Sequence, residues 1–309
     1  MEKKPLKPLS AAALELLPPA EESVKCSVHT AALGVNPAGT GISATMVVLV
    51  DTPQPWPKPV FEHTHLTGVT GQLSNASGQV MRVFASVPSS ATNLGVTVFS
   101  QTAAGAEGTW IPLGSRTPAE IVSALLDQRP LDIPDAVGVT DTAILVCTQG
   151  THDVCCGTEG SALVSQLTED QRFAGVPIFR VSHTGGHRFA PTAITFPDGR
   201  TWAYVGPDQL ATALFHTQPP SAVAPWCRGS WRAPTPRSQA AESAVFAQRD
   251  WTSSKPTFRE LSDDVIEVSS DDQTDRVRVT VSREIPVIRC RAAGGLPAKP
   301  SLEFRAEVL

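Results

Sequence analysis

Residues 143–156 read Ala-Ile-Leu-Val-Cys-Thr-Gln-Gly-Thr-His-Asp-Val-Cys-Cys, an apolar run that ends at a thiol and continues as a polar loop. A short continuous apolar run predicts a buried strand, which here would end at Cys147. The loop returns to a second thiol, Cys156, after eight intervening residues. A helix should follow, because Leu163 and Leu167 share one helical face. This order of strand, loop and helix begins an α/β unit.

The chain that follows completes the unit. A second strand is predicted over Val176–Val181, and it would deliver His183 to the end of that strand. The runs Ala193–Phe196 and Trp202–Val205 flank a Pro-Asp-Gly turn and predict a hairpin. A helix is expected over Pro207–Phe215. The resulting order βαβββα is compatible with a thioredoxin-like domain, although order alone fits many α/β folds.

The regions on either side also mix strands and helices. Thr117 and Glu120 form a capping box that predicts a helix to about Gln128. An Ala-rich helix is expected over residues 237–248. Further strands are predicted at Met46–Val50, Val80–Val87, Val96–Phe99, Val265–Val268, Arg276–Val281 and Ser301–Val308. No internal repeat is evident in the sequence.

The length of 309 residues predicts two domains or lobes. We expect an α/β fold in which a thioredoxin-like ferredoxin domain is embedded in a larger mixed α/β body. The predicted parts are an N-terminal extension over 1–25, an N-terminal α/β lobe over 26–137, the thioredoxin-like domain over 138–218, and a C-terminal helix and strand extension over 219–309.

Composition excludes several classes of function. An apolar content of 41% and a charged content of 18% suit a soluble globular protein, and the net charge of −5 gives no reason to expect nucleic acid as a partner. Apolar runs such as Met46–Val50 are far too short for membrane insertion. The N-terminus lacks the apolar core of a signal peptide, so we expect a cytoplasmic protein. Six cysteines are too sparse for a secreted disulfide scaffold and indicate free thiols or ligands.

Four metal-binding side chains fall within a short stretch. Cys147 and Cys156 are followed by His183-Thr-Gly-Gly-His187, and thiolates and imidazoles suit iron–sulfur clusters and zinc. The cysteine loop can bracket one iron of a 2Fe–2S cluster. Both histidines can reach the second iron if Gly185 and Gly186 make a tight turn.

Two other kinds of site use the same residues. The four side chains could hold a structural zinc ion, or Cys155 and Cys156 could serve a thiol–disulfide redox enzyme. Against zinc, the cysteines are further apart than usual and the Gly-Gly pair disfavours a helix between the histidines. Spacing alone leaves all three open. The other cysteines, Cys26, Cys227 and Cys290, are scattered and are predicted to be structural thiols.

Two strings resemble a known family. Cys-Thr-x-Gly-x-x-Asp-x-Cys-Cys and Ser-His-Thr-Gly-Gly-His-Arg-Phe-Ala are similar to those of the sucrase/ferredoxin-like family, a group of thioredoxin-like 2Fe–2S ferredoxins. The resemblance spans roughly residues 26–244. It implies that the cluster ligands are Cys147, Cys156, His183 and His187. It also implies a one-electron carrier, rather than a catalyst with its own substrate, that exchanges electrons with a partner protein, a reductase or an acceptor.

This chain departs from the usual family pattern in three places. Gln149 stands where a His is common, His152 where an Arg is common, and Val181 where many relatives carry a Cys. None of the three is an implied ligand. The departures change the polarity of the loop and leave the four-ligand set intact, while Cys155 remains either a spare ligand or a packed thiol.

Overall fold

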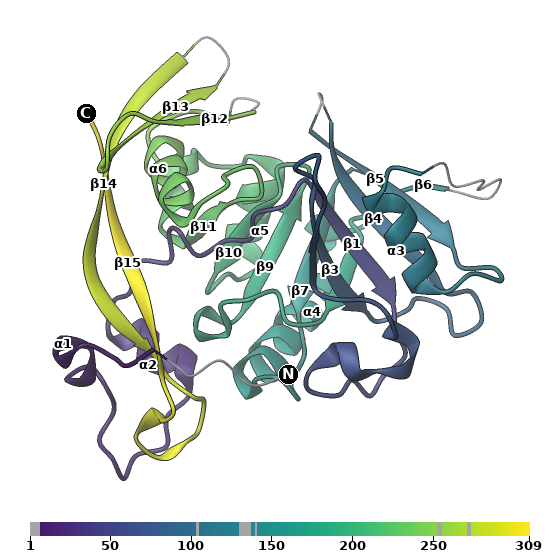
Figure 1. The fold of residues 1–309 in the computed structure, drawn as a ribbon, viewed down its shortest axis with the longest axis horizontal. Helices are drawn as coiled ribbons and strands as arrows, with labels where there is room; N and C mark the ends of the chain where they lie inside the picture. Colours follow the sequence, from purple (N-terminus) through teal and green to yellow (C-terminus); the bar gives the residue numbers. More distant parts are fainter. Residues whose placement is uncertain (1–6, 103–104, 130–136, 140, 252–254, 271–272) are drawn as a thin grey trace.

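A computed structural model describes residues 7–102, 105–129, 137–139, 141–251, 255–270 and 273–309. The expected α/β class is confirmed, with two sheets and six α-helices among these residues (Figure 1). The helices are α1 (Ala11–Leu14), α2 (Cys26–Ala32), α3 (Pro118–Leu126), α4 (Ser161–Glu169), α5 (Pro207–Phe215) and α6 (Pro236–Phe246). None of the described helices is long and apolar enough to cross a membrane.

The larger sheet holds eleven of the described strands in the order β11-β10-β9-β7-β8-β3-β1-β4-β5-β6, with β2 paired to β3. Their bounds are β1 (Met46–Asp51), β2 (Gln72–Ser74), β3 (Val80–Ser86), β4 (Gly95–Thr102), β5 (Gly105–Pro112), β6 (Val137–Val139), β7 (Ala143–Cys147), β8 (Ile178–Val181), β9 (Thr192–Phe196), β10 (Arg200–Ala203) and β11 (Cys227–Ser230).

The strands and helices predicted over residues 143–215 are present as β7-α4-β8-β9-β10-α5, in the order βαβββα. Strand β7 pairs parallel to β8 on one side and antiparallel to β9 on the other, and β9 and β10 form the predicted hairpin. Every residue of β7 is buried, because helices and sheet neighbours surround it. Both faces of α/β strands are covered in this way, which explains the continuous apolar run in the sequence.

The N-terminal half repeats this topology without repeating the sequence. Strand β1 pairs parallel to β3 and antiparallel to β4, β4 pairs with β5, and α3 follows. The connection from β1 to β3 carries two short 3-10 turns, η1 (Val60–Glu62) and η2 (Thr64–Leu66), where the other half has α4. Helix α3 begins at the predicted capping box of Thr117 and Glu120.

The two halves meet edge to edge at β3 and β8. The Ser182 N–H donates to the Ala85 carbonyl (2.8 Å), and the Val87 N–H donates to the Arg180 carbonyl (2.9 Å). A single apolar core spans the joint, in which the rings of Phe99 and Phe196 stack with centroids 4.1 Å apart. The joint fixes the end of β8, from which the histidine-bearing loop leaves.

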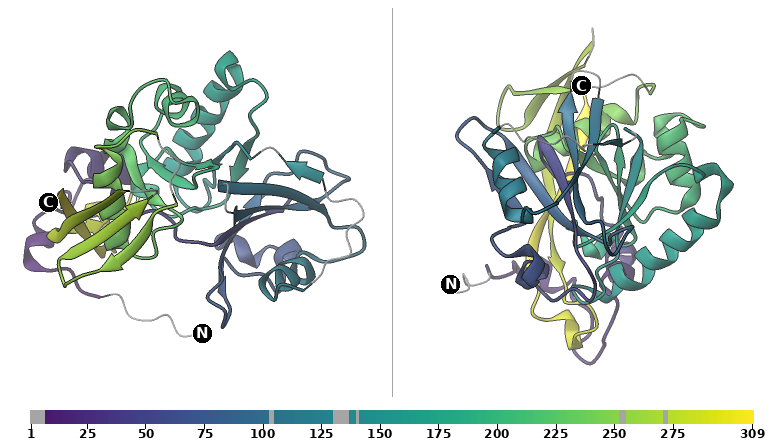
Figure 2. Two further views of the ribbon diagram at one scale, coloured as in Figure 1. Left: turned by 90° about the horizontal axis from the view of Figure 1, so that it is seen from above. Right: turned by 90° about the vertical axis from the view of Figure 1, so that its right-hand side faces the viewer.

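The C-terminal part forms a second, antiparallel sheet of β12 (Thr257–Glu260), β13 (Val265–Ser270), β14 (Gln273–Val287) and β15 (Lys299–Val308). Figure 2 shows it on the side of the β7–α5 unit opposite the N-terminal half. Strands β14 and β15 are long enough to run from α6 down to α1 and α2 (Figure 1). The turn that joins them therefore lies beside the N-terminal helices.

Candidate metal centre

Three of the four predicted ligands gather at the carboxyl ends of β7 and β8. Cys147 is the last residue of β7, and His183 lies just beyond β8. Because parallel strands end at the same edge of a sheet, the two side chains are brought together. Cys156 comes back to them at the start of the helical segment that leads into α4. The ligand atoms of Cys147, Cys156 and His183 all lie within 4.8 Å of one another, and both thiols are buried.

Glycines allow the cysteine loop to close this tightly. A Cβ on Gly160 would lie 2.0 Å from the Cys147 carbonyl oxygen, and a Cβ on Gly157 would lie 2.5 Å from the Cα of Gly150. Any side chain at either position would push the helix away from the end of β7. The sequence Gly-x-x-Gly after the second thiol thus permits the close approach of Cys156 to Cys147.

His183 is held by its backbone, and its ring keeps a free nitrogen. Its N–H donates to Gln149 Oε1 (3.1 Å), while Gln149 Nε2 donates to the Pro57 carbonyl (2.9 Å). The ring stacks on that of His152 with centroids 3.8 Å apart. His183 Nδ1 is buried and has no hydrogen-bond partner in the described part of the chain. A buried nitrogen without a partner costs free energy unless something binds it.

The three residues that depart from the family pattern are all at this site or beside it. Gln149 joins the two ligand loops, as just described. His152 covers the His183 ring, and burial together with the positive field of His183 and Lys58 lowers the pKa of His152 to about 3. Val181 is the buried last residue of β8. His152 therefore lies over the site as a neutral ring rather than as the cation that an Arg would supply.

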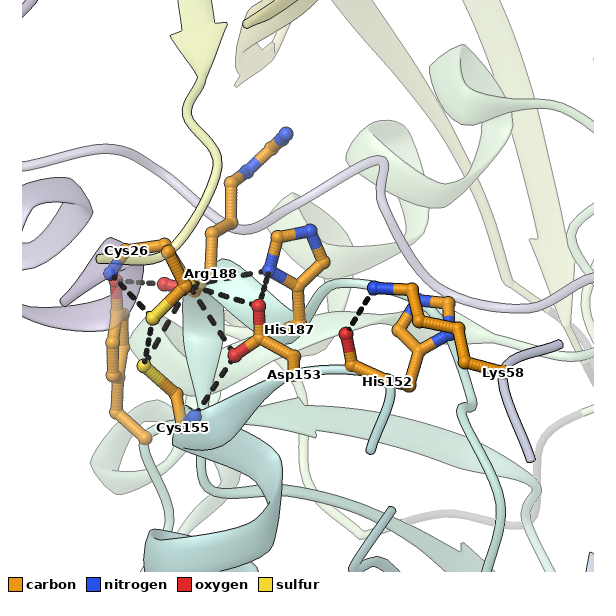
Figure 3. A network of polar contacts seen from close by, with 9 residues as sticks. Cys26, Lys58, His152, Asp153, Cys155, His187 and Arg188 are labelled. Atoms are coloured by element: carbon orange, nitrogen blue, oxygen red, sulfur yellow. Dashed lines mark hydrogen bonds and ion pairs between the residues drawn. The ribbon is translucent and has the colours of Figure 1, made fainter. Parts of the chain in front are cut away.

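His187 lies slightly apart from the other three ligands. Its ring centroid is 5.8 Å from that of His183, and its Nδ1 is 2.9 Å from Asp153 Oδ2. Figure 3 shows the second ring nitrogen turned away from the carboxylate. Histidines that bind metals commonly donate their other ring N–H to a carboxylate in this way. Burial alone would raise the pKa of Asp153, but the hydrogen bond and charge of His187 outweigh it and lower the pKa to about 2.

Cys147 and Cys156 influence each other's ionisation, and the buried cation Arg228 lies near both sulfurs. The hydrogen bond from Cys156 holds the pKa of Cys147 well below its ordinary value despite burial, and the same bond raises the pKa of Cys156. Of the two, Cys147 is therefore the thiol that loses its proton more readily. Arg228, which is fully buried, interacts electrostatically with both sulfurs and donates from Nη1 to the Gly185 carbonyl (3.2 Å). A Cβ on Gly186 would clash with this guanidinium, so the Gly-Gly turn and Arg228 fit each other.

A second group of donors, which sequence reasoning missed, lies beside the first. Ligand atoms of Cys26, Asp153, Cys155 and Cys290 all lie within 4.8 Å of one another. From the sequence, Cys26 and Cys290 are predicted to be structural thiols. They lie too far apart in the chain for any metal-binding motif to connect them. Cys155 belongs to this group and not to the group of Cys147, Cys156 and His183. A hydrogen bond from the Cys26 thiol lowers the pKa of Cys155 to about 5 despite burial.

Comparison with known proteins gives a relative that is similar to this chain over a short stretch only. The chain is 33% identical over 63 residues to altered inheritance of mitochondria protein 32 of Meyerozyma guilliermondii. The aligned part is 19% of this chain and 22% of that protein, so the chain spans about a fifth of the relative's length. No solved structure gives a significant match.

The family comparison covers much more of the chain. The profile described as sucrase/ferredoxin-like matches residues 37–229, which is more than half of the sequence. The matched region contains both halves of the large sheet and both ligand strings. The chain belongs to the sucrase/ferredoxin-like family.

Proposed function

We propose that this protein carries one electron at a time on a 2Fe–2S cluster held by Cys147, Cys156, His183 and His187. The observation that carries the proposal is the convergence of two buried thiols, Cys147 and Cys156, with the His183 imidazole, and the His187 ring lies 5.8 Å from that of His183. His183 presents a buried nitrogen with no partner among the described residues. His187 has one nitrogen occupied by Asp153, which orients the other.

The donor set fits such a cluster in charge as well as in number. Two ferric ions and two sulfides sum to about +2, so two thiolates make the oxidised centre neutral, whereas four thiolates would leave it at about −2. A neutral centre accepts an electron more readily. Arg228 adds a buried positive charge near the thiolates. Because the pKa of Cys156 is raised, cluster binding must release its proton, and assembly should weaken in acid.

Electron exchange with another protein requires a centre near the surface. Gly150 and Thr151 are exposed on the cysteine loop, and the His187 side chain is 20% exposed. Encounters between redox proteins are typically small and transient. We therefore propose that the partner, a reductase or an acceptor protein, approaches over the cysteine loop and the histidines.

The test is the metal content of the full chain purified without oxygen. We expect about two iron atoms and two acid-labile sulfides per cluster-loaded chain, a brown colour and an electron paramagnetic resonance signal on one-electron reduction. A colourless protein with zinc bound by the same four residues would establish the structural zinc site instead. A chain that binds no metal and cycles a disulfide through Cys155 or Cys156 would establish the thiol–disulfide enzyme.

A further inference from the structure

The second donor group is built from three segments that are distant in the sequence. Cys26 is the first residue of α2, Asp153 and Cys155 belong to the cysteine loop, and Cys290 lies in the turn between β14 and β15. Figure 3 shows Cys26, Asp153 and Cys155 pointing toward one another. Cys26, Asp153 and Cys155 are buried and Cys290 is half-buried. Four donors thus meet in a nearly closed space.

Three of the six donor pairs in this group are in close contact, and the ligand atoms of the other three pairs lie within 4.8 Å of one another. Cys155 Sγ is 3.6 Å from Cys26 Sγ and 3.3 Å from Cys290 Sγ. Cys26 Sγ is 3.6 Å from Asp153 Oδ1 and 3.7 Å from Oδ2. The backbone N–H of Cys26 also lies 3.5 Å from Cys290 Sγ, which closes the arrangement.

These spacings resemble the edges of a tetrahedral metal site. With zinc about 2.3 Å from sulfur and about 2.0–2.2 Å from oxygen, tetrahedral edges are about 3.7 Å between sulfurs and about 3.5 Å between sulfur and oxygen. The observed contacts agree with both values, the Cys155–Cys290 pair being the shortest. Only small side-chain movements would place all four donors around one ion.

We propose that Cys26, Asp153, Cys155 and Cys290 form a second metal site, which binds one divalent ion of the zinc type in a structural role. Three thiolates and a carboxylate form a closed donor set with no position left for a substrate, as in structural zinc sites. Soft sulfur donors favour zinc over magnesium or calcium. The site shares none of the four proposed cluster ligands, although His187 Nδ1 lies beside it, 3.2 Å from Cys26 Sγ and 2.9 Å from Asp153 Oδ2.

A disulfide explains the arrangement less well. Cys155 lies at similar distances from Cys26 and Cys290, so neither pair is selected, and either bond would leave a third thiol beside a buried carboxylate. A metal ion uses all four groups at once. Three thiolates, one carboxylate and a divalent ion leave a net charge of about −2. Arg188, which interacts electrostatically with Cys26, offsets part of that charge.

Asp153 connects the two centres. Its Oδ1 accepts the Cys155 N–H (2.9 Å) and faces Cys26, while its Oδ2 holds His187 Nδ1. The proposed ion would therefore fix the same carboxylate that orients a proposed cluster ligand. It would also tie α2 and the β14–β15 turn to the cysteine loop. Binding converts thiols to thiolates, with the released protons passing to solvent.

The first test is zinc analysis of the full chain purified from zinc-supplemented cells. We expect about one zinc per chain, lost in Cys26→Ser and in Cys290→Ser. The matched control is Cys227→Ser, since Cys227 is buried elsewhere beside Arg200. It should keep the zinc, as should the double variant Cys147→Ser with Cys156→Ser. Zinc that disappears with Cys147 and Cys156 and persists without Cys26 and Cys290 would place the ion in the other centre and overturn the proposal.

The second test needs no variant of the proposed site. Cobalt(II) titrated into the reduced, zinc-stripped Cys147→Ser/Cys156→Ser chain should give thiolate-to-cobalt charge transfer and tetrahedral ligand-field bands at about one equivalent. Zinc should then displace the cobalt and bleach the bands. A chain without zinc as purified and without these bands on titration would refute the site. Mass spectrometry that finds Cys155 in a disulfide, with no metal bound, would refute it equally.

Discussion

Asp153 is the residue on which most of the site chemistry depends. It is buried between His187 and the thiol of Cys26, and it accepts hydrogen bonds on both oxygens. A carboxylate in this position decides which nitrogen of His187 carries the proton. Neighbouring Cys155 and Cys156 are adjacent in sequence, yet they face different donor groups. Substitutions at single positions should therefore separate the two groups.

The first prediction concerns cluster ligation. Cys147→Ser and Cys156→Ser should each lower iron content to below about a tenth of wild type, because even a lost second-sphere partner costs about 10–100-fold in metal affinity. Cys155→Ser should leave the visible absorption spectrum largely unchanged, since its thiol faces Cys26. A protein bleached by Cys155→Ser and coloured in Cys156→Ser would shift the ligand assignment by one residue.

The second prediction concerns pH and Asp153. Its pKa of about 2 in the folded chain lies below the ordinary 3.8, so the carboxylate stabilises the fold by roughly 2 kcal/mol at neutral pH. Because the folded pKa is depressed, this stabilisation is complete above about pH 4 and is lost as the pH falls toward about 2. Urea unfolding of metal-free wild type and Asp153→Asn should differ most above pH 4 and converge in acid. A difference independent of pH would show that Asp153 does not act through its charge.

At the scale of elements, the site depends on how one loop joins β7 to α4. The strand ends at Cys147, and the helical segment begins so close to it that glycine is required. The sequence signals for β7 and α4 were strong because both elements bury apolar faces. The histidine turn is fixed differently: Arg228, on β11, holds Gly185. The cysteine loop is thus positioned by close packing against β7, and the histidine turn is positioned by the buried guanidinium of Arg228.

The third prediction tests the close approach of loop and helix. Gly160→Ala would place a methyl group against the Cys147 carbonyl, and overpacking of this kind costs about 1–3 kcal/mol. The displaced Cys156 should also lower iron content. The matched control is Gly138→Ala, where a Cβ meets no atom of the described residues within 4 Å, so stability should change by less than about 0.5 kcal/mol. Urea unfolding would measure the stability of the two variants, and iron analysis their metal content. If both variants had the same stability and iron content, the steric argument would be wrong.

At the scale of the whole molecule, two halves with the same strand arrangement share one sheet and one core. Only the second half carries the four proposed cluster ligands, and its β8 pairs with β3 of the first half. The predicted boundaries of the domains, 26–137 and 138–218, remain a prediction. The core around Phe99 and Phe196 nevertheless indicates that the halves stabilise each other.

The fourth prediction is that the halves unfold together. Phe99→Ala removes a fully buried ring of the first half and should cost about 3–5 kcal/mol. Because that ring stacks on Phe196, the cluster should be lost in the same transition as the secondary structure. Phe215→Ala serves as control, since Phe215 is 41% exposed and should matter little. Two separate unfolding transitions, with cluster colour following only the second half, would show that the halves are independent.

The sequence by itself determined the local elements and the donor set. Apolar runs predicted β1 and β7, the Thr117 capping box predicted the start of α3, and the thiol and imidazole spacings identified the residues that converge. The strands and the helix start depend on neighbours within a few residues, where periodicity and capping act directly. The sequence did not predict α2, because that helix has no side-chain cap, or β11, because that strand lies in a proline-rich stretch.

The tertiary structure alone decided the rest. The repeated topology is invisible in the sequence, because many apolar sequences satisfy the same strand arrangement. His187 turns to Asp153, a contact that depends on how two loops pack. Cys26 and Cys290 meet across 264 positions of sequence, carried together by the long β14–β15 ribbon and α2. No local propensity encodes such a contact. Its position follows only from the burial of apolar faces throughout the chain.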